Sequence, residues 1–185
     1  MLSTPIPSWL LAMDARKPYR EVLDGQPLLA VSPHHAHGQI AVRIGAQLDA
    51  WAEGRGAVGA EVRFSLPCAD GTWSSLLPDV SYTSFARLPH DPIDAWQRPR
   101  IAPDLAVEIV SPGDRPAATA RKVATYLEHG ATVVVVLHPE TRRVVLHGSG
   151  WSGEERVARG SWELPPFAGL VLDWERIYRD IVLPR

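Results

Sequence analysis

The sequence holds almost no cysteine, and this limits the kinds of site it can build. Cys68 is the only cysteine among 185 residues, so an intramolecular disulfide and a thiolate-cluster zinc site are both excluded. No apolar run approaches the roughly 20 residues of a membrane-spanning helix. The N-terminal stretch MLSTPIPSWLLAMDARKPYR lacks the basic-then-apolar order of a signal peptide. We therefore expect a protein of a reducing compartment, the cytoplasm, with no membrane partner.

An excess of charge of one sign is also missing. The formal net charge is −2, which supplies no electrostatic argument for nucleic-acid binding, because that binding depends on Lys and Arg neutralising phosphates. A local basic stripe could still be masked by acidic residues elsewhere. Length and composition predict a single globular domain over residues 19–185, preceded by a proline-containing N-terminal extension over residues 1–18.

Hydrophobic periodicity predicts the elements of the first half of the chain. Residues 19–31 are typical of a β-hairpin, because Asp24-Gly25 separates two apolar-rich runs. Ile40, Ile44 and Leu48 recur at helical spacing and predict a helix over residues 34–53. Alternation then predicts a strand over residues 57–66, and a shorter strand over residues 74–82. Pro78 in that second strand indicates an edge position or a bulge.

The second half contains a strand–helix–strand unit. DLAVEIV predicts a strand over residues 104–110, and a helix follows to His129 with an apolar stripe of Ala120, Val123, Ala124 and Leu127. TVVVVL, residues 132–137, is apolar on both faces and predicts a buried interior strand. This order implies a parallel pair of strands joined by a right-handed crossover. A short helix near residues 174–178 is expected to close the chain.

Two carboxylates stand where apolar residues are expected. Glu108 lies within a strand of apolar neighbours, and Asp79 follows the apolar pair in SSLLPDV. A carboxylate in such a place must be paired, protonated or bound to a metal. Two of them on adjacent strands would form an oxygen-rich site for Mg²⁺ or Mn²⁺. The alternative, taken from the pattern alone, is a structural ion pair with a basic residue.

At these residues the chain resembles the Uma-type restriction endonuclease family of the PD-(D/E)xK nuclease superfamily. The likeness covers roughly residues 19–180. The segments that carry it are YREVLDGQPLLAVSP with the helix after it, EVRF from Glu61, LLPDVSY around Asp79, APDLAVEIVSPGDR at 102–115, RKVATYLEHGA at 121–131, and LPPFAGLVLDWERIY near the C-terminus. The resemblance implies an α/β fold with a restriction-endonuclease-like core: a central mixed sheet flanked by helices, with an N-terminal β-hairpin.

The resemblance also implies a function and a set of site residues. Asp79 and Glu108 become the ligands of a Mg²⁺ or Mn²⁺ ion, and the activity becomes endonucleolytic hydrolysis of DNA, with a homodimer implied for duplex cutting. The superfamily's usual lysine would fall at Val110, so the family's lysine from the next helix, here Lys122, takes the catalytic role. His37, Glu61 and Tyr126 are carried over as accessory residues.

Plainer interpretations stand beside these roles. Without the family, Lys122 is a solvated lysine, His37 a satisfied core histidine, and Glu61 a solvent-exposed residue. Asp104 shares the face of Glu108 but is expected to be structural. Whole-protein alternatives are a non-catalytic nucleic-acid- or protein-binding module that keeps the fold, and an α/β domain whose carboxylates form ion pairs.

Two further features of the sequence bear on activity. His138 stands where relatives commonly have an aspartate, at the predicted end of a strand, so altered activity is an open alternative. The proline-rich segment 84–103 connects the two carboxylate-bearing strands, and we expect it to flank the cleft, where Arg87, Arg98 and Arg100 could contact phosphates.

Overall fold

The computed structural model describes residues 5–14, 21–28, 35–88, 94–148 and 150–183. Residues 19–20 and 29–31, the two ends of the predicted hairpin, lie outside the described residues, as do residues 89–93 of the proline-rich segment. Across the described ranges, no helix is both long and apolar enough to cross a membrane.

A six-stranded sheet forms the centre of the molecule, in the order β10-β9-β8-β7-β6-β3. Its strands are β3 (Gly56–Gly59), β6 (Val80–Ser84), β7 (Leu105–Ile109), β8 (Val133–His138), β9 (Arg143–Gly148) and β10 (Trp151–Val157). β7 and β8 run parallel, while the other neighbouring pairs are antiparallel. The sheet is therefore mixed, and the predicted parallel pair around the crossover helix is confirmed.

Within the described ranges, the remaining elements are a smaller sheet, a hairpin and five helices. The smaller sheet has the order β2-β1-β5-β4, with β1 (Glu21–Leu23), β2 (Gln26–Leu28), β4 (Phe64–Pro67) and β5 (Trp73–Leu76). The hairpin pairs β11 (Ser161–Glu163) with β12 (Val171–Asp173). The helices are α1 (Ser8–Asp14), α2 (His35–Ala52), α3 (Asp94–Gln97), α4 (Pro116–Glu128) and α5 (Trp174–Tyr178).

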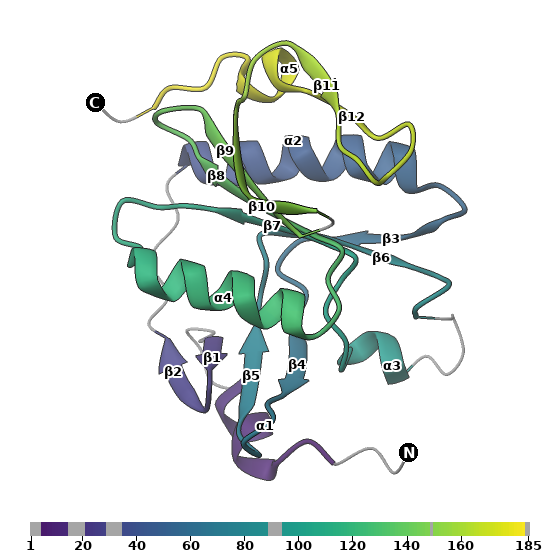
Figure 1. Ribbon diagram of the computed structural model, residues 1–185, viewed down its shortest axis with the longest axis vertical. Helices are drawn as coiled ribbons and strands as arrows, with labels where there is room; N and C mark the ends of the chain where they lie inside the picture. Colours follow the sequence, from purple (N-terminus) through teal and green to yellow (C-terminus); the bar gives the residue numbers. More distant parts are fainter. Residues whose placement is uncertain (1–4, 15–20, 29–34, 89–93, 149, 184–185) are drawn as a thin grey trace.

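These elements stack in layers about the central sheet (Figure 1). α2, α5 and the β11–β12 hairpin cover one face, where Ile40, Ile44 and Leu48 of α2 join Trp174 in the larger buried cluster. α4 lies on the other face, with the smaller sheet beyond it, and a second cluster fills this side. The expected α/β fold, a central mixed sheet flanked by helices, is confirmed.

The predictions of one continuous strand over residues 57–66 and another over residues 74–82 are wrong. Each segment forms two separate strands. The first divides into β3 and β4, and the second into β5 and β6, with the halves in different sheets. Glu61 has a φ of 51°, which interrupts an extended strand. Its amide donates to the carbonyl of Pro78, a residue that has no N–H for a sheet ladder. Asp79 therefore lies in the short segment that leads from β5 in the smaller sheet to β6 in the central sheet.

The face that α4 buries also differs from the predicted stripe. Its buried residues are Val123, Thr125 and Tyr126, whereas Ala120 is exposed. Tyr126 and Val123 pack in one cluster with Val134 of the central sheet and Phe64 of the smaller sheet. Because the smaller sheet covers the polar side of α4, Lys122 cannot be the solvated lysine of the plainer interpretation, and only 12 % of its side chain is exposed.

Candidate active site

Antiparallel pairing of β6 with β7 brings Asp79 beside Glu108. Val80 is opposite Val107 in the register, so Asp79 lies next to the end of β7 that carries Glu108. One Asp79 oxygen, Oδ2, accepts a hydrogen bond from the Ile109 amide at 2.6 Å. The other, Oδ1, is 2.8 Å from Nε2 of His37 at the start of α2. Asp79 is thus fixed by both a strand and a helix.

His37 links Asp79 to the loop that follows β7. Its Nδ1 is 3.1 Å from the hydroxyl of Ser111, whose own amide donates to the Asp114 carboxylate at 2.7 Å. Burial lowers the pKa of His37, but the hydrogen bond and charge of Asp79, together with Asp114 and Glu108, raise it by more. The net pKa is above the usual value, which favours the imidazolium form beside Asp79.

Glu108 is held by two side chains of α4. Lys122 Nζ lies 2.5 Å from Glu108 Oε2, and the Tyr126 hydroxyl donates to Oε1 at 2.8 Å. Lys122 and Tyr126 are one helical turn apart in α4, so their side chains lie on the same side of the helix. Each oxygen of the buried Glu108 carboxyl group therefore has a hydrogen-bonding partner, as a buried polar group requires.

Glu21 completes the cluster, and our sequence analysis did not single it out. Its Oε1 lies 3.0 Å from Lys122 Nζ and accepts from the Leu77 amide at 2.8 Å. A signal was present, since Glu21 shares one face of β1 with the buried Leu23. Like Glu108, Glu21 is a polar residue on a strand face that also carries an apolar buried residue, and this pattern can be recognised in sequence.

The charges of Glu108, its neighbours Glu21 and Asp79, and Lys122 determine the electrostatics of the cluster. Burial raises the pKa of Glu108 to about 8, with Glu21 and Asp79 adding to burial and Lys122 opposing it. Burial lowers the pKa of Lys122, but the charges of Glu108 and Glu21 raise it by more, to above its usual value. Lys122 is therefore protonated at neutral pH and carries a fixed positive charge in the cluster.

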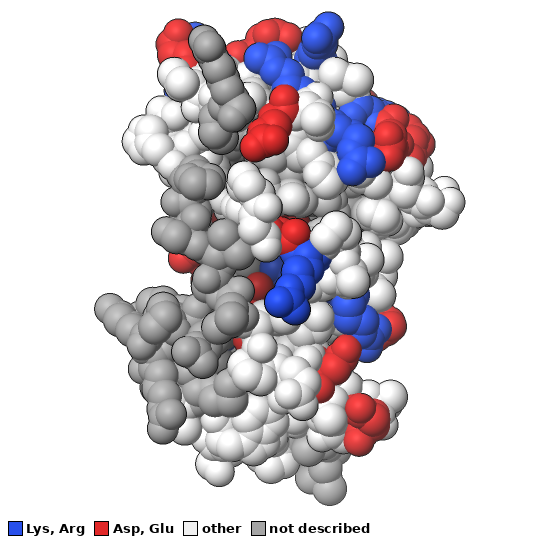
Figure 2. Space-filling model, turned by 90° about the vertical axis from the view of Figure 1, so that its left-hand side faces the viewer, with Lys and Arg blue, Asp and Glu red and all other residues white. Residues whose placement is uncertain are grey.

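The cluster opens to solvent through a cleft of about 390 Å³ beside the start of α4. Glu21, Glu108 and Lys122 lie in its wall, with Asp114 and Thr119 nearer the start of the helix. Figure 2 views the side of the molecule on which the loop from β7 enters α4, and there Lys and Arg alternate with Asp and Glu. The cleft is thus accessible without belonging to a broad basic surface.

Comparison with models of known protein families shows the family of this chain. The model of the Uma2 family, described as "Putative restriction endonuclease", matches residues 8–176. The chain belongs to this family. The match includes every residue of the cluster, and it also includes α1, which lies within the predicted N-terminal extension.

The Uma2 fold is also present in a solved structure. The crystal structure of a "putative nuclease belonging to DUF820" from Anabaena variabilis superposes with a TM-score of 0.78 at 21 % identity, covering 91 % of this chain and 94 % of that one. At this identity the likeness shows the fold alone. A search among curated proteins finds no match.

The structure brings most of the predicted site residues together. His37, Asp79, Glu108, Lys122 and Tyr126 form one connected cluster. Glu61 is exposed, and among the described contacts its side chain makes none with this cluster. Asp104 accepts from the Ser84 amide at 2.8 Å and lies 3.4 Å from Arg87, at the opposite end of β7 from Glu108.

The expectation for the proline-rich segment is wrong. It leaves β6 at Ser84 and enters β7 at Leu105, and Tyr82 is paired with Leu105 at this end of the two strands. Because β6 and β7 are antiparallel, Asp79 and Glu108 lie at their other ends. The described parts of the segment therefore lie away from the cleft. In Figure 1, α3, which belongs to this segment, lies on the opposite side of the molecule from the start of α4.

The donor atoms suit a hard divalent cation, with one condition. Asp79, Glu108 and Glu21 supply the carboxylate oxygens that Mg²⁺ and Mn²⁺ prefer. Among the described residues, however, no three His, Cys, Asp or Glu side chains are grouped so as to hold a metal ion. His37 and Lys122 now neutralise Asp79 and Glu108. A cation that enters must therefore replace or share one of these partners.

Proposed function

We propose that this Uma2-family chain is a metal-dependent endonuclease that hydrolyses DNA phosphodiester bonds. Asp79 and Glu108 would hold Mg²⁺ or Mn²⁺, and Lys122 would assist. The observation that carries the proposal is the buried Lys122 ammonium, 2.5 Å from Glu108 and 3.0 Å from Glu21, in the wall of an open cleft. An ion pair that serves stability alone seldom needs an opening to solvent, whereas a catalytic one does.

Each residue has a role that follows from its contacts. A bound divalent ion supplies an activated water and stabilises charge on a phosphoryl oxygen. Lys122, protonated and desolvated, adds a positive charge where negative charge grows in the transition state. Tyr126 holds one Glu108 oxygen, and the Ile109 amide holds one Asp79 oxygen, so both carboxylates are oriented before substrate arrives. His37, whose Nε2 lies 2.8 Å from Asp79 Oδ1, would orient that carboxylate.

One observation favours the non-catalytic alternative. The carboxylates are already neutralised by Lys122 and His37, so the fold does not need a metal to be stable. A binding module that keeps the nuclease fold would show the same contacts. The two functions differ in what a single substitution at Glu108 does to turnover.

Cleavage of supercoiled DNA in Mg²⁺ or Mn²⁺ tests the proposal. The wild type should nick or linearise the DNA, and Glu108→Gln should lower the rate by at least about a hundredfold, as loss of a central electrostatic group does. Glu61→Gln is the matched control, since that glutamate is exposed and outside the cluster. Equal rates for wild type and Glu108→Gln, or no cleavage by either with metal present, would favour the binding module.

A further inference from the structure

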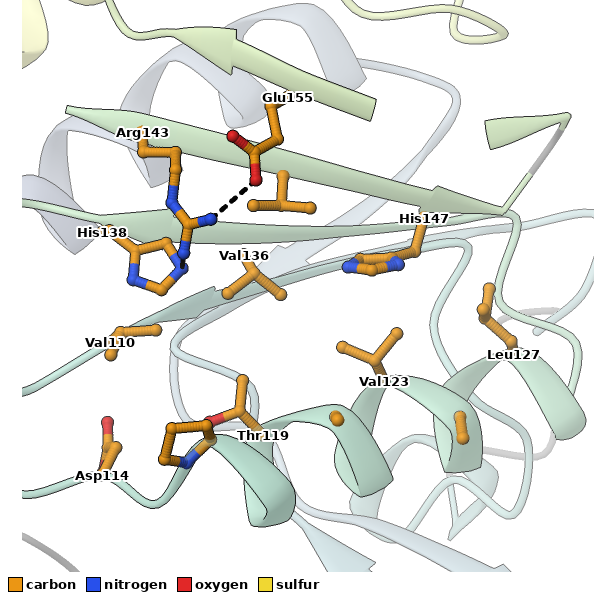
Figure 3. Close-up of a pocket in the computed structure, with 14 residues that line it drawn as sticks. Val110, Asp114, Thr119, Val123, Leu127, Val136, His138, Arg143, His147 and Glu155 are labelled. Carbon is orange, nitrogen blue, oxygen red and sulfur yellow. Dashed lines mark hydrogen bonds and ion pairs between the residues drawn. The ribbon is translucent and has the colours of Figure 1, made fainter. Parts of the chain in front are cut away.

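A second hollow lies on the other side of α4, between this helix and the strands β8 and β9 of the central sheet (Figure 3). Its volume is about 450 Å³, within the range of roughly 300–1,000 Å³ that is usual for small-molecule sites. The apolar stripe of α4, from Ala120 to Leu127, lines this space, and Val123 within it also packs in the core cluster. Val136 and Val145 of the sheet face it.

Polar groups from the sheet border this apolar space. Arg143 of β9 donates to Glu155 of β10 at 2.7 Å and lies 2.9 Å from Nε2 of His138 at the end of β8. Because arginine has no acceptor, His138 Nε2 must accept, which leaves Nδ1 as a hydrogen-bond donor when the ring is neutral. Figure 3 shows the His147 imidazole extending from the sheet over the same space.

The charges around the hollow favour an uncharged ligand. Burial lowers the pKa of His147, and burial with the charge of Arg143 lowers that of His138, so both imidazoles are neutral at pH 7. The charge of Arg143 is compensated by Glu155, and Asp114 adds a negative charge at the wall. Among its described lining residues, the hollow has no uncompensated positive charge to bind an anion. A planar molecule with apolar faces and a polar edge could make apolar contacts with the walls and hydrogen bonds with the polar side chains.

The hollow adjoins the carboxylate cleft. Asp114 and Thr119 line both spaces, so the two meet at the start of α4. A polymer whose backbone lies in the cleft can therefore place a neighbouring group in the hollow. His138 lies in this hollow and, among the described contacts, makes none with Asp79 or Glu108.

We propose that the hollow binds one unpaired nucleobase of the nucleic acid whose backbone lies in the carboxylate cleft. A base has flat apolar faces for the walls formed by Ala120, Ala124 and Val136, and edge donors and acceptors for His138 and His147. This proposal rests on the proposed nuclease function and narrows its substrate class to strands that are single or locally unpaired. A base in a stacked duplex cannot enter unless it is extruded.

Titration of the full-length protein with adenosine, followed through its imidazole NMR signals, tests the hollow directly. His138→Gln and His147→Gln assign the two signals. Adenosine should shift both with one saturable curve, and ribose 5-phosphate, which has no base, should shift neither. Ala120→Trp, at an exposed wall position, should weaken adenosine binding about tenfold or more, since stacking contributes that much per base. Ala124→Leu provides a second, smaller filling change on the same wall.

The control is Ala117→Trp, an exposed alanine of α4 outside both spaces, which should bind adenosine as the wild type does. A single-stranded oligonucleotide should lose affinity in Ala120→Trp but not in Ala117→Trp. The proposal is overturned if adenosine shifts neither imidazole, if ribose 5-phosphate shifts them equally, or if both filled variants bind adenosine normally. It is also overturned if Ala120→Trp converts a wild-type dimer into monomers, because a second copy then covers the hollow.

Failure of this proposal is distinguishable from failure of the nuclease function. The adenosine titration needs neither a metal nor a phosphodiester bond, and DNA cleavage can be measured in Ala120→Trp. Cleavage with no adenosine binding would overturn the base site alone. Adenosine binding without metal-dependent cleavage would overturn the nuclease function and leave a nucleobase-binding module.

Discussion

At the scale of single residues, the buried cluster around Glu108 contains more carboxyl groups than ammonium groups. Glu21 and Glu108 both contact Lys122, Asp79 adds its charge near Glu108, and the hydroxyl of Tyr126 supplies the remaining donor to Glu108. Such a group is stable only while each buried oxygen keeps its partner, because an unpaired buried charge is costly. The contribution of each partner can therefore be measured by removing it.

Tyr126→Phe should destabilise the protein by about 1–3 kcal/mol, because it leaves Oε1 of the buried Glu108 without its donor. Urea denaturation measures this free energy of unfolding. Tyr178→Phe is the matched control: the buried Tyr178 hydroxyl has no hydrogen-bond partner among the described residues, so its removal should cost little or stabilise the protein. Equal losses in the two variants would show that the Tyr126–Glu108 bond contributes nothing specific.

The raised pKa of Glu108 predicts a pH dependence of stability. Between its unfolded pKa of about 4.5 and its folded pKa of about 8, the native state binds more protons than the unfolded state. The free energy of unfolding should therefore fall as pH rises through this window. Urea midpoints from pH 5 to 8.5 should fall less steeply in Glu108→Gln than in the wild type, and parallel curves would contradict the raised pKa.

Sequence pattern alone indicated the carboxylates but not their partners. Glu108 and Asp79 were identifiable because each interrupts an apolar strand segment. The role of Lys122 came only from the family resemblance, since helical periodicity describes one helix face and cannot show that a second sheet covers the opposite one. Glu21 was not predicted, because a strand of three residues places only one other residue, Leu23, on the same face. The periodic signal at Glu21 is therefore much weaker than at Glu108.

At the scale of elements, the β1–β2 hairpin is fixed to α4 by a side chain next to Lys122. Arg121 donates to both oxygens of Asp24, from Nε at 2.7 Å and from Nη2 at 2.9 Å. Asp24 and Gly25 both have positive φ, so they form the tight turn of the hairpin that carries Glu21. The bidentate pair thereby sets the distance between Glu21 on the hairpin and Lys122 on the helix.

Arg121→Lys should loosen this hairpin, because lysine cannot reproduce the two-pronged contact. The Leu77 amide, which donates to Glu21, should then exchange its hydrogen about tenfold faster or more, as loss of a local hydrogen bond allows. Glu128→Gln is the control, since it removes only the more exposed partner of Arg121. Unchanged exchange at Leu77 in Arg121→Lys would show that the hairpin is held by other contacts.

The helix α2 and the β7–α4–β8 unit were predictable at this scale, and the exchange of strands between sheets was not. Apolar alternation continues across Glu61, because Val58 packs, partly buried, against one core cluster while Phe64 and Leu66 are buried in the other. A pattern of buried and exposed positions cannot reveal which layer buries a residue. The positive φ of Glu61 and the missing N–H of Pro78 locate the break, and only the second can be recognised in sequence.

At the scale of the whole molecule, the mixture of charges predicts weak, local electrostatics in DNA binding. Net charge is −2, and Arg115 and Lys122 are the basic residues that line the described part of the cleft. The slope of log affinity against log salt should therefore be no steeper than about −2, at roughly −0.9 for each neutralised phosphate.

Fluorescence anisotropy between about 50 and 200 mM salt measures this slope. Arg115→Gln should make it shallower by about 1, whereas Arg159→Gln, an exposed charge remote from the cleft, should not. A wild-type slope steeper than about −5 would mean that DNA lies across a different and more basic surface.

Binding of a divalent cation by Asp79 and Glu108 can be measured by calorimetric titration of Mn²⁺. The wild type, a folded Asp79→Asn/Glu108→Gln variant and an Asp104→Asn control should be titrated with and without a single-stranded oligonucleotide. Asp104 is an equally buried carboxylate of the same strand region, outside the cluster. We expect Mn²⁺ binding by the wild type and by Asp104→Asn, and loss of this binding in the double variant. Binding that survives in the double variant, or none by the wild type under either condition, would contradict this expectation.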